Sequence, residues 1–250
     1  MSLVDVTRDG PVATVTLSRA EKRNAMSSAM SAAVAVAFRE LSAEDGLRVV
    51  LLKGDGPSFC AGADVREMAG LDPVTAAAFI RGLHHAIQAV MDCPVPVVAA
   101  IHGACVGAGL ELVAGADLRV ASADARFAMP EVLVGIPSVI EAALLPRLIG
   151  RGRAARLVLT GEVIDAATAE RWGLVEEVAA PDRLAERAAA LAHAIAEADP
   201  AAVRAQKALC RQWDTLPIAE AVEASVAVFA ASYATDAPRR RLSAVLERRG

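Results

Sequence analysis

Short apolar runs alternate with longer helical segments through most of the sequence, and this alternation restricts the folds that the chain can adopt. The run RVVLLKG (48–54) is apolar on all sides, as is typical of a strand covered on both faces of a parallel sheet. Periodicity predicts further elements: strands over Val12–Arg19, 94–103 and Leu118–Ser122, and helices over 27–45 and 73–91. Strand, helix and strand in repeated order predicts an α/β fold built from repeated units.

The strand signals end at Val178, and from about Asp182 the sequence has only helical patterns. Pro200 suits the first turn of a new helix, where its missing N–H costs nothing. We therefore predict two parts, a core over residues 1–190 that holds the functional site and a helical part over residues 191–250 that serves oligomerisation. The sequence leaves open whether these helices pack on their own core or on a neighbouring subunit.

Charge and composition argue against several classes of partner. The formal net charge is −4 and only 3% of the residues are aromatic, so we expect neither a basic surface nor stacking platforms for nucleic acid. No stretch of about eighteen uncharged apolar residues is present, so we predict no membrane span. The N-terminus lacks the apolar segment of a signal peptide. A cytoplasmic location is the resulting prediction.

The cysteines and histidines do not have the spacing of a metal site. His84 and His85 are adjacent, so on a helix they point about 100° apart, and His102 and His193 are isolated. No metal ligand set is therefore predicted. The cysteines are interpreted as reduced thiols without disulfide spacing: Cys60, Cys93, Cys105 and Cys210.

Two stretches of small residues indicate a ligand that approaches the main chain. FCAGAD (59–64) follows a loop, and HGACVGAGLEL (102–112) follows a predicted strand and begins a helix near Gly107. A helix N-terminus has N–H groups without intrahelical partners and a partial positive charge. A dinucleotide loop is excluded, because Leu112 stands where that fingerprint needs Gly or Ala. We predict an oxyanion site at which the N–H groups of Ala63 and Ala108 converge on one oxygen.

Four motifs in order resemble the crotonase family, the enoyl-CoA hydratase/isomerase superfamily: FCAGADVREM, HGACVGAGLELVAGADLRVAS, FAMPEVLVGIPS and LTGEVIDAATAERWGLVEEV. The segment LSRAEKRNAM matches as well, and the similarity runs from about Val12 to Val178. The resemblance implies a spiral of ββα units with C-terminal helices, assembled as a homotrimer or as a dimer of trimers. It also implies an acyl-CoA thioester substrate, with no cofactor beyond the coenzyme A that the substrate carries.

The resemblance also implies roles for single residues. Ala63 and Ala108 match the positions whose N–H groups bind the thioester oxygen; many members have Gly at the second position, but Ala keeps the N–H. Glu111 and Glu131 match the two catalytic glutamates of the hydratases. The region that holds the nucleotide end of coenzyme A is matched by Lys22, Arg23, Ala25, Ala61, Asp64 and Val65.

The positions of the two glutamates suggest opposite protonation states. Glu111 follows Ala108 by one helical turn, and the positive helix end favours its ionised form, which suits a base that orients water. Glu131 lies in MPEV, after a strand and a proline-stiffened turn. A carboxyl group in an apolar pocket stays protonated, so we expect Glu131 to deliver the proton.

Glu141 has two interpretations. SVIEAALL (138–145) has the spacing of a capping box, with Ser138 as N-cap and Glu141 at N3. In the alternative, Glu141 is an additional acid of the active site. Many hydratases have a glycine-rich turn here, whereas this chain has a longer segment before Arg147. This difference leaves the choice between hydratase and isomerase open.

Other reactive or basic residues receive structural interpretations. No histidine is placed to activate Cys60, so we expect it to be a packing residue. We interpret Lys207 and the arginines 239–241 as a solvated basic face, with contact to coenzyme A phosphates as the alternative. Trp172 is expected in the core at a helix end, with Gly173 as the stop signal.

The residues and the resemblance together predict an enzyme, an enoyl-CoA hydratase that adds water across the C2=C3 bond of an α,β-unsaturated acyl-CoA. The first alternative is a double-bond isomerase of the same superfamily. The second, from another class, is a non-catalytic acyl-CoA-binding or scaffold protein, against which the pair of glutamates argues. Binding of coenzyme A without binding of NAD would exclude a redox enzyme.

Overall fold

The computed structural model describes residues 2–247 and contains a six-stranded sheet in the order β1-β2-β3-β4-β6-β9. β1 pairs with β2 in antiparallel orientation, and every other neighbouring pair in this sheet is parallel. The strands are β1 (Val4–Asp9), β2 (Val12–Leu17), β3 (Val49–Gly54), β4 (Val97–Ile101), β6 (Leu118–Ser122) and β9 (Glu177–Ala179). The predicted α/β architecture with parallel strands is confirmed.

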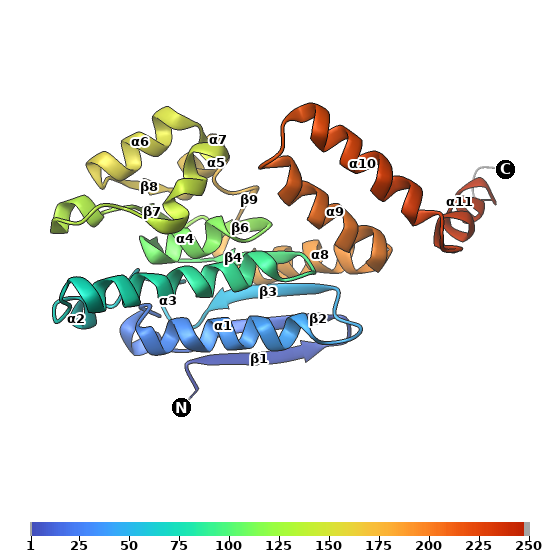
Figure 1. Cartoon of the computed structure of the whole chain (residues 1–250). Helices are drawn as coiled ribbons and strands as arrows, with labels where there is room; N and C mark the ends of the chain where they lie inside the picture. Colours follow the sequence, from blue (N-terminus) through green and yellow to red (C-terminus); the bar gives the residue numbers. More distant parts are fainter. Residues whose placement is uncertain (1, 248–250) are drawn as a thin grey trace.

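Helices cover both faces of this sheet (Figure 1). α1 (Ser28–Ser42), α3 (Pro73–Asp92) and α4 (Ala108–Ala114) lie on one side, and α8 (Leu184–Glu197) packs on β3, β4 and β6 from the other. In β3, Val50 and Leu52 pack in the hydrophobic core on the side of α1, α3 and α4, and Val49 packs in the core on the side of α8. β4 is apolar along its whole length because both of its faces are buried, whereas the edge strand β1 is largely exposed and polar.

A smaller sheet stands at the end of the large one and carries one of the small-residue stretches. β5 (Ala104–Val106) pairs in parallel with β7 (Arg126–Ala128), which pairs in antiparallel orientation with β8 (Val163–Asp165). The remaining elements lie between these strands and the longer helices: η1 (Ala20–Lys22), α2 (Val65–Met68), η2 (Glu131–Val134), η3 (Ile140–Leu144), α5 (Leu145–Ile149), α6 (Arg151–Thr160), α7 (Ala166–Trp172) and η4 (Pro181–Arg183). Gly173 ends α7 in the left-handed conformation, as expected. Trp172 is only half-buried and packs against the edge of the core, so its expected place inside the core is wrong.

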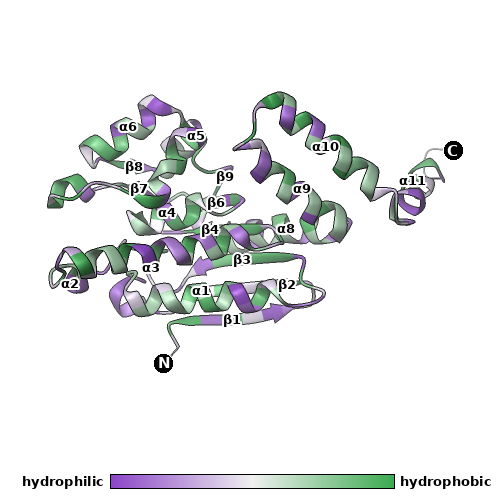
Figure 2. Ribbon diagram, viewed as in Figure 1, coloured by the Kyte–Doolittle hydropathy of each residue, from purple (hydrophilic) through white to green (hydrophobic). Residues whose placement is uncertain are grey.

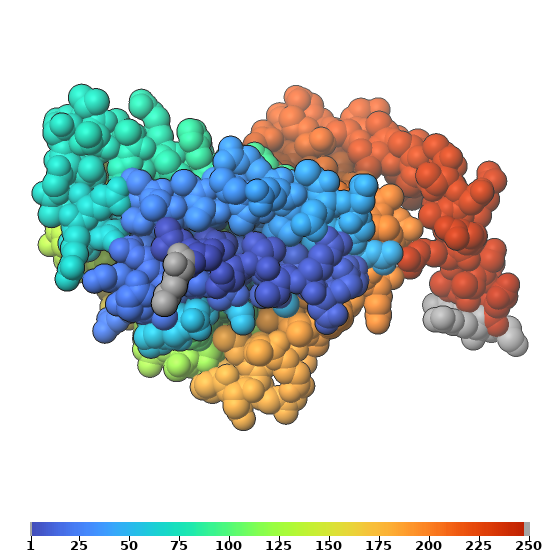
Figure 3. Space-filling view, turned by 90° about the horizontal axis from the view of Figure 1, so that it is seen from below, coloured from blue at the N-terminus to red at the C-terminus, as the bar shows by residue number. Residues whose placement is uncertain are grey.

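The C-terminal helices α9 (Pro200–Trp213), α10 (Ile218–Ser232) and α11 (Ala237–Glu247) extend to one side of the molecule (Figures 1 and 3). Much of the apolar surface of α10 is exposed, including Ile218 at 84% and Phe229 at 67%, and Figure 2 shows this helix as largely hydrophobic. Within residues 2–247, no single helix has the length and hydropathy of a membrane span; α10 and α11 meet those criteria only as a pair bent by 81°.

The predicted division after residue 190 lies inside α8, which is part of the core. The oligomerisation role of residues 191–250 stays a prediction, and its last three residues, like Met1, lie outside the described part of the chain.

The interpretation of Lys207 as part of a solvated face is wrong. This residue is only 7% exposed, and its Nζ donates to Asp117 Oδ2 at 2.6 Å and to the carbonyl oxygen of Val95 at 3.0 Å. A buried ammonium group needs hydrogen-bond partners, and Lys207 finds them in the residues that precede β4 and β6. This contact holds α9 against the start of these strands. The arginines 239–241 are exposed, as the solvated-face interpretation expects.

Candidate active site

The structure brings the two small-residue stretches side by side. The N–H of Phe59 donates to the carbonyl of His102 at 2.8 Å, the N–H of Cys60 to that of Ala104 at 3.0 Å, and the N–H of Val106 back to Cys60 at 3.0 Å. A Cβ on Gly109 would lie 2.6 Å from the carbonyl oxygen of Cys60, so only glycine permits this approach. Backbone proximity explains why both stretches consist of small residues.

The N–H groups of Ala63 and Ala108 are both available to a ligand. Ala108 is the first residue of α4, so its N–H has no intrahelical acceptor. Gly107 before it has φ 52°, a conformation that favours glycine, and this turn directs the chain from β5 into the helix. Within residues 2–247, neither N–H donates a backbone hydrogen bond.

One pocket of about 480 Å³ collects the predicted site residues. Ala63, Ala108, Glu111 and Glu131 all line it. The rest of the wall is apolar and comes from α2, α3 and the loop between η2 and η3; it includes Met68, Phe79, Ile80, Leu83, Ile136 and Val139. The sequence-based expectation that both glutamates and both backbone donors share one cavity therefore agrees with the geometry.

Glu111 is a buried residue in the wall of this pocket. The residue is 4% exposed, and its Oε1 accepts a hydrogen bond from the N–H of Ala142 at 3.2 Å. Burial raises the pKa of Glu111 to about 8, and the nearby charges of Glu131 and Glu141 add to the rise. The expectation that the helix end keeps Glu111 ionised is wrong, because loss of solvation outweighs the helix dipole here. Glu111 holds the proton at neutral pH.

Glu131 starts η2 and faces the beginning of α4. Its Oε2 accepts a hydrogen bond from the hydroxyl of Ser138 at 2.7 Å. A Cβ on Gly107 would overlap Glu131 Oε1, so glycine at 107 makes room for this carboxylate. Sequence reasoning missed the contact of Ser138, because a serine seven positions away carries no local signal for it.

The capping-box interpretation of Ser138 and Glu141 is wrong. η3 begins at Ile140, the residue before it makes no side-chain cap, and Ile140 itself has φ 41°. Ser138 is bonded to Glu131 instead. The Glu141 side chain is 7% exposed and its Oε1 lies 2.6 Å from Nδ1 of His84 on α3. Within residues 2–247, no three His, Cys, Asp or Glu side chains are grouped as metal ligands.

The residues expected near coenzyme A lie outside this pocket, around η1 and the start of α2. Lys22, Arg23 and Val65 are exposed, and the N–H of Ala61 donates to the carbonyl of Arg23 at 2.9 Å. Asp64 caps α2 and accepts from Arg19 at 2.7 Å; this hydrogen bond holds the pKa of the Asp64 carboxyl below its usual range. The contact of this region, including Ala25, with coenzyme A stays a prediction.

Cys60 has the properties of a packing residue. It is fully buried in the main core, and burial raises the pKa of its thiol to about 12. A thiol that stays protonated is a poor nucleophile.

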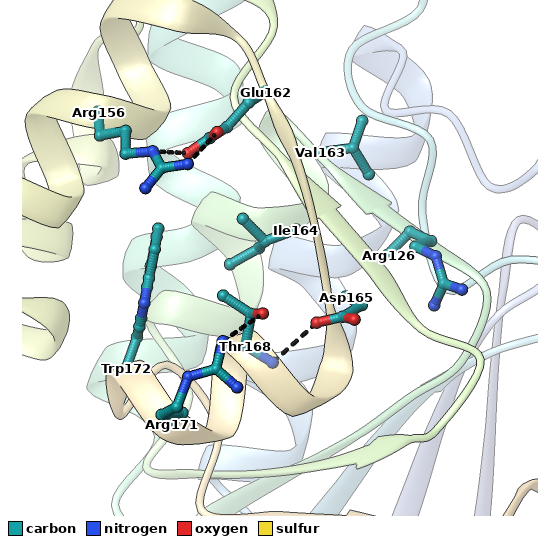
Figure 4. Close-up of a pocket in the computed structure, with 9 residues that line it drawn as sticks. All are labelled: Arg126, Arg156, Glu162, Val163, Ile164, Asp165, Thr168, Arg171 and Trp172. Carbon is teal, nitrogen blue, oxygen red and sulfur yellow. Dashed lines mark hydrogen bonds and ion pairs between the residues drawn. The ribbon is translucent and has the colours of Figure 1, made fainter.

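A second pocket of about 470 Å³ lies between β7, β8, α6 and α7 (Figure 4). Arg156 pairs with Glu162 at 2.5 Å, Asp165 accepts from the N–H of Thr168 at 2.8 Å, and Arg171 donates to the hydroxyl of Thr168 at 2.8 Å. None of the predicted catalytic residues lines this pocket. The apolar pocket with the two glutamates is therefore the candidate active site.

Comparison with known proteins agrees with this geometry. The family model described as enoyl-CoA hydratase/isomerase matches residues 7–250. A probable enoyl-CoA hydratase of Rhizobium meliloti is 36% identical over 98% of this chain and 95% of its own length. A mevalonyl-coenzyme A hydratase of Aspergillus fumigatus is 38% identical over 85% of this chain and 79% of its own length.

Solved structures show the same fold. The crystal structure of an enoyl-CoA hydratase of Mycobacterium smegmatis superposes with a TM-score of 0.95 at 34% identity, covering 98% of this chain and 96% of that one. That of an enoyl-CoA hydratase of Bacillus anthracis gives a TM-score of 0.94 at 30% identity, with the same coverage. The predicted crotonase-type fold is confirmed. The chain is an enzyme that belongs to the enoyl-CoA hydratase/isomerase family.

Proposed function

We propose that this enzyme is an enoyl-CoA hydratase that adds water to an α,β-unsaturated acyl-CoA with an apolar acyl group. One observation carries the proposal: two free backbone N–H groups and two carboxyl groups line a single apolar pocket, and Glu111, with a pKa of about 8, holds a proton at neutral pH. Hydration requires these parts, an oxyanion site, a proton donor and a base for water.

In the proposed reaction, the thioester oxygen accepts hydrogen bonds from the N–H groups of Ala63 and Ala108. Glu131 takes a proton from water as the water oxygen bonds to C3, and the electrons of the C2=C3 bond move toward the thioester oxygen. The two N–H groups stabilise the resulting enolate. Glu111 then gives its proton to C2, and the two carboxyl groups exchange one proton before the next turnover. These roles reverse the assignment expected from the sequence.

A panel of enoyl-CoA substrates tests the proposal. Straight-chain 2-enoyl-CoAs are expected to lose the absorbance of the conjugated thioester and to form 3-hydroxyacyl-CoAs. A 3-enoyl-CoA that gains this absorbance, without hydration of the 2-enoyl-CoAs, would identify an isomerase instead. Binding of the substrates without any turnover would support the non-catalytic alternative.

The pH dependence should follow Glu111. The reaction needs its protonated form, which is complete well below pH 8 and is lost as the pH rises through about 8. We expect kcat/KM to fall about tenfold per pH unit on the alkaline side of that value. The measurement is kcat/KM for crotonyl-CoA between pH 6 and pH 10, with stability checked at each pH. A plateau up to pH 10 would contradict the assignment of Glu111 as the proton donor.

Ser138 is expected to position Glu131. Its hydroxyl donates to Oε2 at 2.7 Å, which leaves Oε1 for water. Loss of one hydrogen bond to a charged group corresponds to about tenfold, so Ser138→Ala should lower kcat by about that factor with little change in KM. Ser138→Thr keeps the hydroxyl and should restore most of the rate. Equal rates for Ser138→Ala and the wild type would remove Ser138 from the mechanism.

We also propose that the enzyme works in the cytosol as a homotrimer or a dimer of trimers. The exposed apolar residues of α10, with Ile218 84% exposed, support an assembly through the C-terminal helices. Sedimentation of the purified protein measures the oligomeric state directly, and a monomer would contradict the proposal.

A further inference from the structure

Glu141 and His84 form a hydrogen-bonded pair next to the residue that contacts Glu111. Glu141 is 6% exposed, and its Oε1 lies 2.6 Å from Nδ1 of His84, whose side chain is 42% exposed. The second oxygen of Glu141, Oε2, is buried and has no hydrogen-bond partner among the described residues. A carboxylate can only accept hydrogen bonds, so an ionised Glu141 depends on the imidazole N–H for its stabilisation. A buried carboxylate with only one hydrogen-bond partner destabilises the folded state, so its presence indicates a functional role.

The backbone around Glu141 joins the pair to the active site. The next residue, Ala142, donates its N–H to Glu111 Oε1 at 3.2 Å. The preceding residue, Ile140, has φ 41°, and a β-branched residue rarely adopts this left-handed conformation. Such strain persists only where the surrounding contacts impose it, commonly at functional sites. The bond between His84 and Glu141 ties this strained turn to α3.

We propose that His84 and Glu141 form a positioning pair for Glu111, the acid of the proposed hydration. The same contact between His84 and Glu141 has two effects. It holds η3 so that the Ala142 N–H reaches Glu111, and it places a partly compensated negative charge near the carboxyl group of Glu111. The pair does not line the pocket, so its action on the substrate is indirect. This inference rests on the proposed function only for its effect on turnover.

The charged groups around the pair are few. α3 provides His84 and, on its exposed side, His85 and Arg81; α4 provides Glu111 and η2 provides Glu131. α5, which also packs on η3, carries Arg147, and that side chain is exposed. The rings of the two histidines are 5.8 Å apart, yet His85 lines a groove between α1 and α3 rather than facing Glu141. His85 therefore provides a matched control on the same helix.

We expect substitutions of the two partners to shift the pKa of Glu111 in opposite directions. Glu141→Gln removes a negative charge that raises the pKa of Glu111, so this pKa should fall by about half a unit. His84→Gln leaves Glu141 without its compensating imidazole, so the pKa of Glu111 should rise by a similar amount. A purely structural role would not produce shifts of opposite sign. His85→Gln should change nothing.

The experiment is a pH titration of the protein labelled with ¹³C at the glutamate carboxyl carbons. The Glu111 signal is the one that Glu111→Gln lacks, and its midpoint is compared among the wild type, Glu141→Gln, His84→Gln and His85→Gln. A lower midpoint in Glu141→Gln and a higher one in His84→Gln support the pair. Unchanged midpoints in both, or shifts in the same direction, overturn it. If Glu141→Gln does not fold, the half-exposed His84 still gives a test: a higher midpoint in His84→Gln than in His85→Gln supports the pair, and an equal or lower midpoint overturns it.

Turnover provides the second readout. The alkaline limb of kcat/KM for crotonyl-CoA should move with the Glu111 midpoint in each variant, and kcat should fall more than KM changes. If the wild type hydrates no enoyl-CoA, the proposed function fails, and the titration still decides whether the pair controls Glu111. If the wild type is active but its alkaline limb is unchanged in both Glu141→Gln and His84→Gln, the proposed function stands and the positioning role of the pair is wrong.

Discussion

Glu111→Gln is expected to lower kcat for hydration of crotonyl-CoA about 1,000-fold, with a much smaller change in KM. The amide has nearly the size and shape of the carboxyl group and keeps an oxygen for the Ala142 N–H, but it has no proton to give to C2. Loss of a positioned general acid costs about two to four orders of magnitude. The measurement is kcat from initial rates at pH 7.

The same substitution should stabilise the protein, which separates lost chemistry from lost folding. The pKa of Glu111 is about 8 in the folded protein, against 4.5 for an unperturbed glutamate. The folded state therefore binds more protons than the unfolded state between these values, and its stability falls as the pH rises from about 4.5 to 8. Gln has no such cost, so the stability gain of the variant should be larger at pH 9 than at pH 5. Glu40→Gln, on the exposed side of α1, should change neither property. Wild-type kcat in Glu111→Gln would exclude Glu111 as the acid.

Ala108→Pro is expected to lower kcat about 100-fold or more while the fold is kept. Proline removes the backbone N–H that is proposed to bind the thioester oxygen, and loss of one oxyanion donor costs about two to three orders of magnitude. Ala108 is the first residue of α4, a position that tolerates proline well. Gly107 has φ 52° and ψ −120°, which is the mirror image of the extended conformation that residues adopt before proline. Glycine adopts both forms equally well, so a proline at 108 fits after it. The measurements are kcat and the thermal unfolding temperature.

Ala108→Gly is the matched control for this variant. It keeps the N–H and the space in the pocket, so its kcat should stay within a few-fold of the wild type. The proline ring also occupies space near the substrate, and KM reports that effect separately. A proline variant with wild-type kcat would show that the Ala108 N–H is not an oxyanion donor.

Local patterns were sufficient to predict the parallel sheet and the start of α4. The strands β3 and β4 are buried on both faces, and that burial appears in the sequence as uninterrupted apolar runs. The glycines near residue 108 likewise indicated a close approach of backbone, which the hydrogen bonds of Cys60 to the 104–106 segment confirm.

The electrostatics of the site could not be predicted in the same way. The protonation of Glu111 depends on burial under η3, which lies about 30 positions later, and the helix-dipole argument considered only α4. The partner of Glu141 is His84, which is 57 positions away. The spacing of Ser138 and Glu141 fits a capping box, but the positive φ of Ile140 prevents that cap. In each case, contacts between residues far apart in the sequence outweigh the local interaction that the sequence pattern predicts.

The most direct test of the oxyanion site is the infrared band of a bound thioester carbonyl. Butyryl-CoA labelled with ¹³C at the carbonyl carbon has no double bond, so it binds without being hydrated, and the isotope difference isolates its C=O stretch. If the N–H groups of Ala63 and Ala108 polarise this carbonyl, the band of the bound ligand lies at lower wavenumber than in water. It then moves back toward the free value in Ala108→Pro. A band in the wild-type complex at the position found in water would contradict the account.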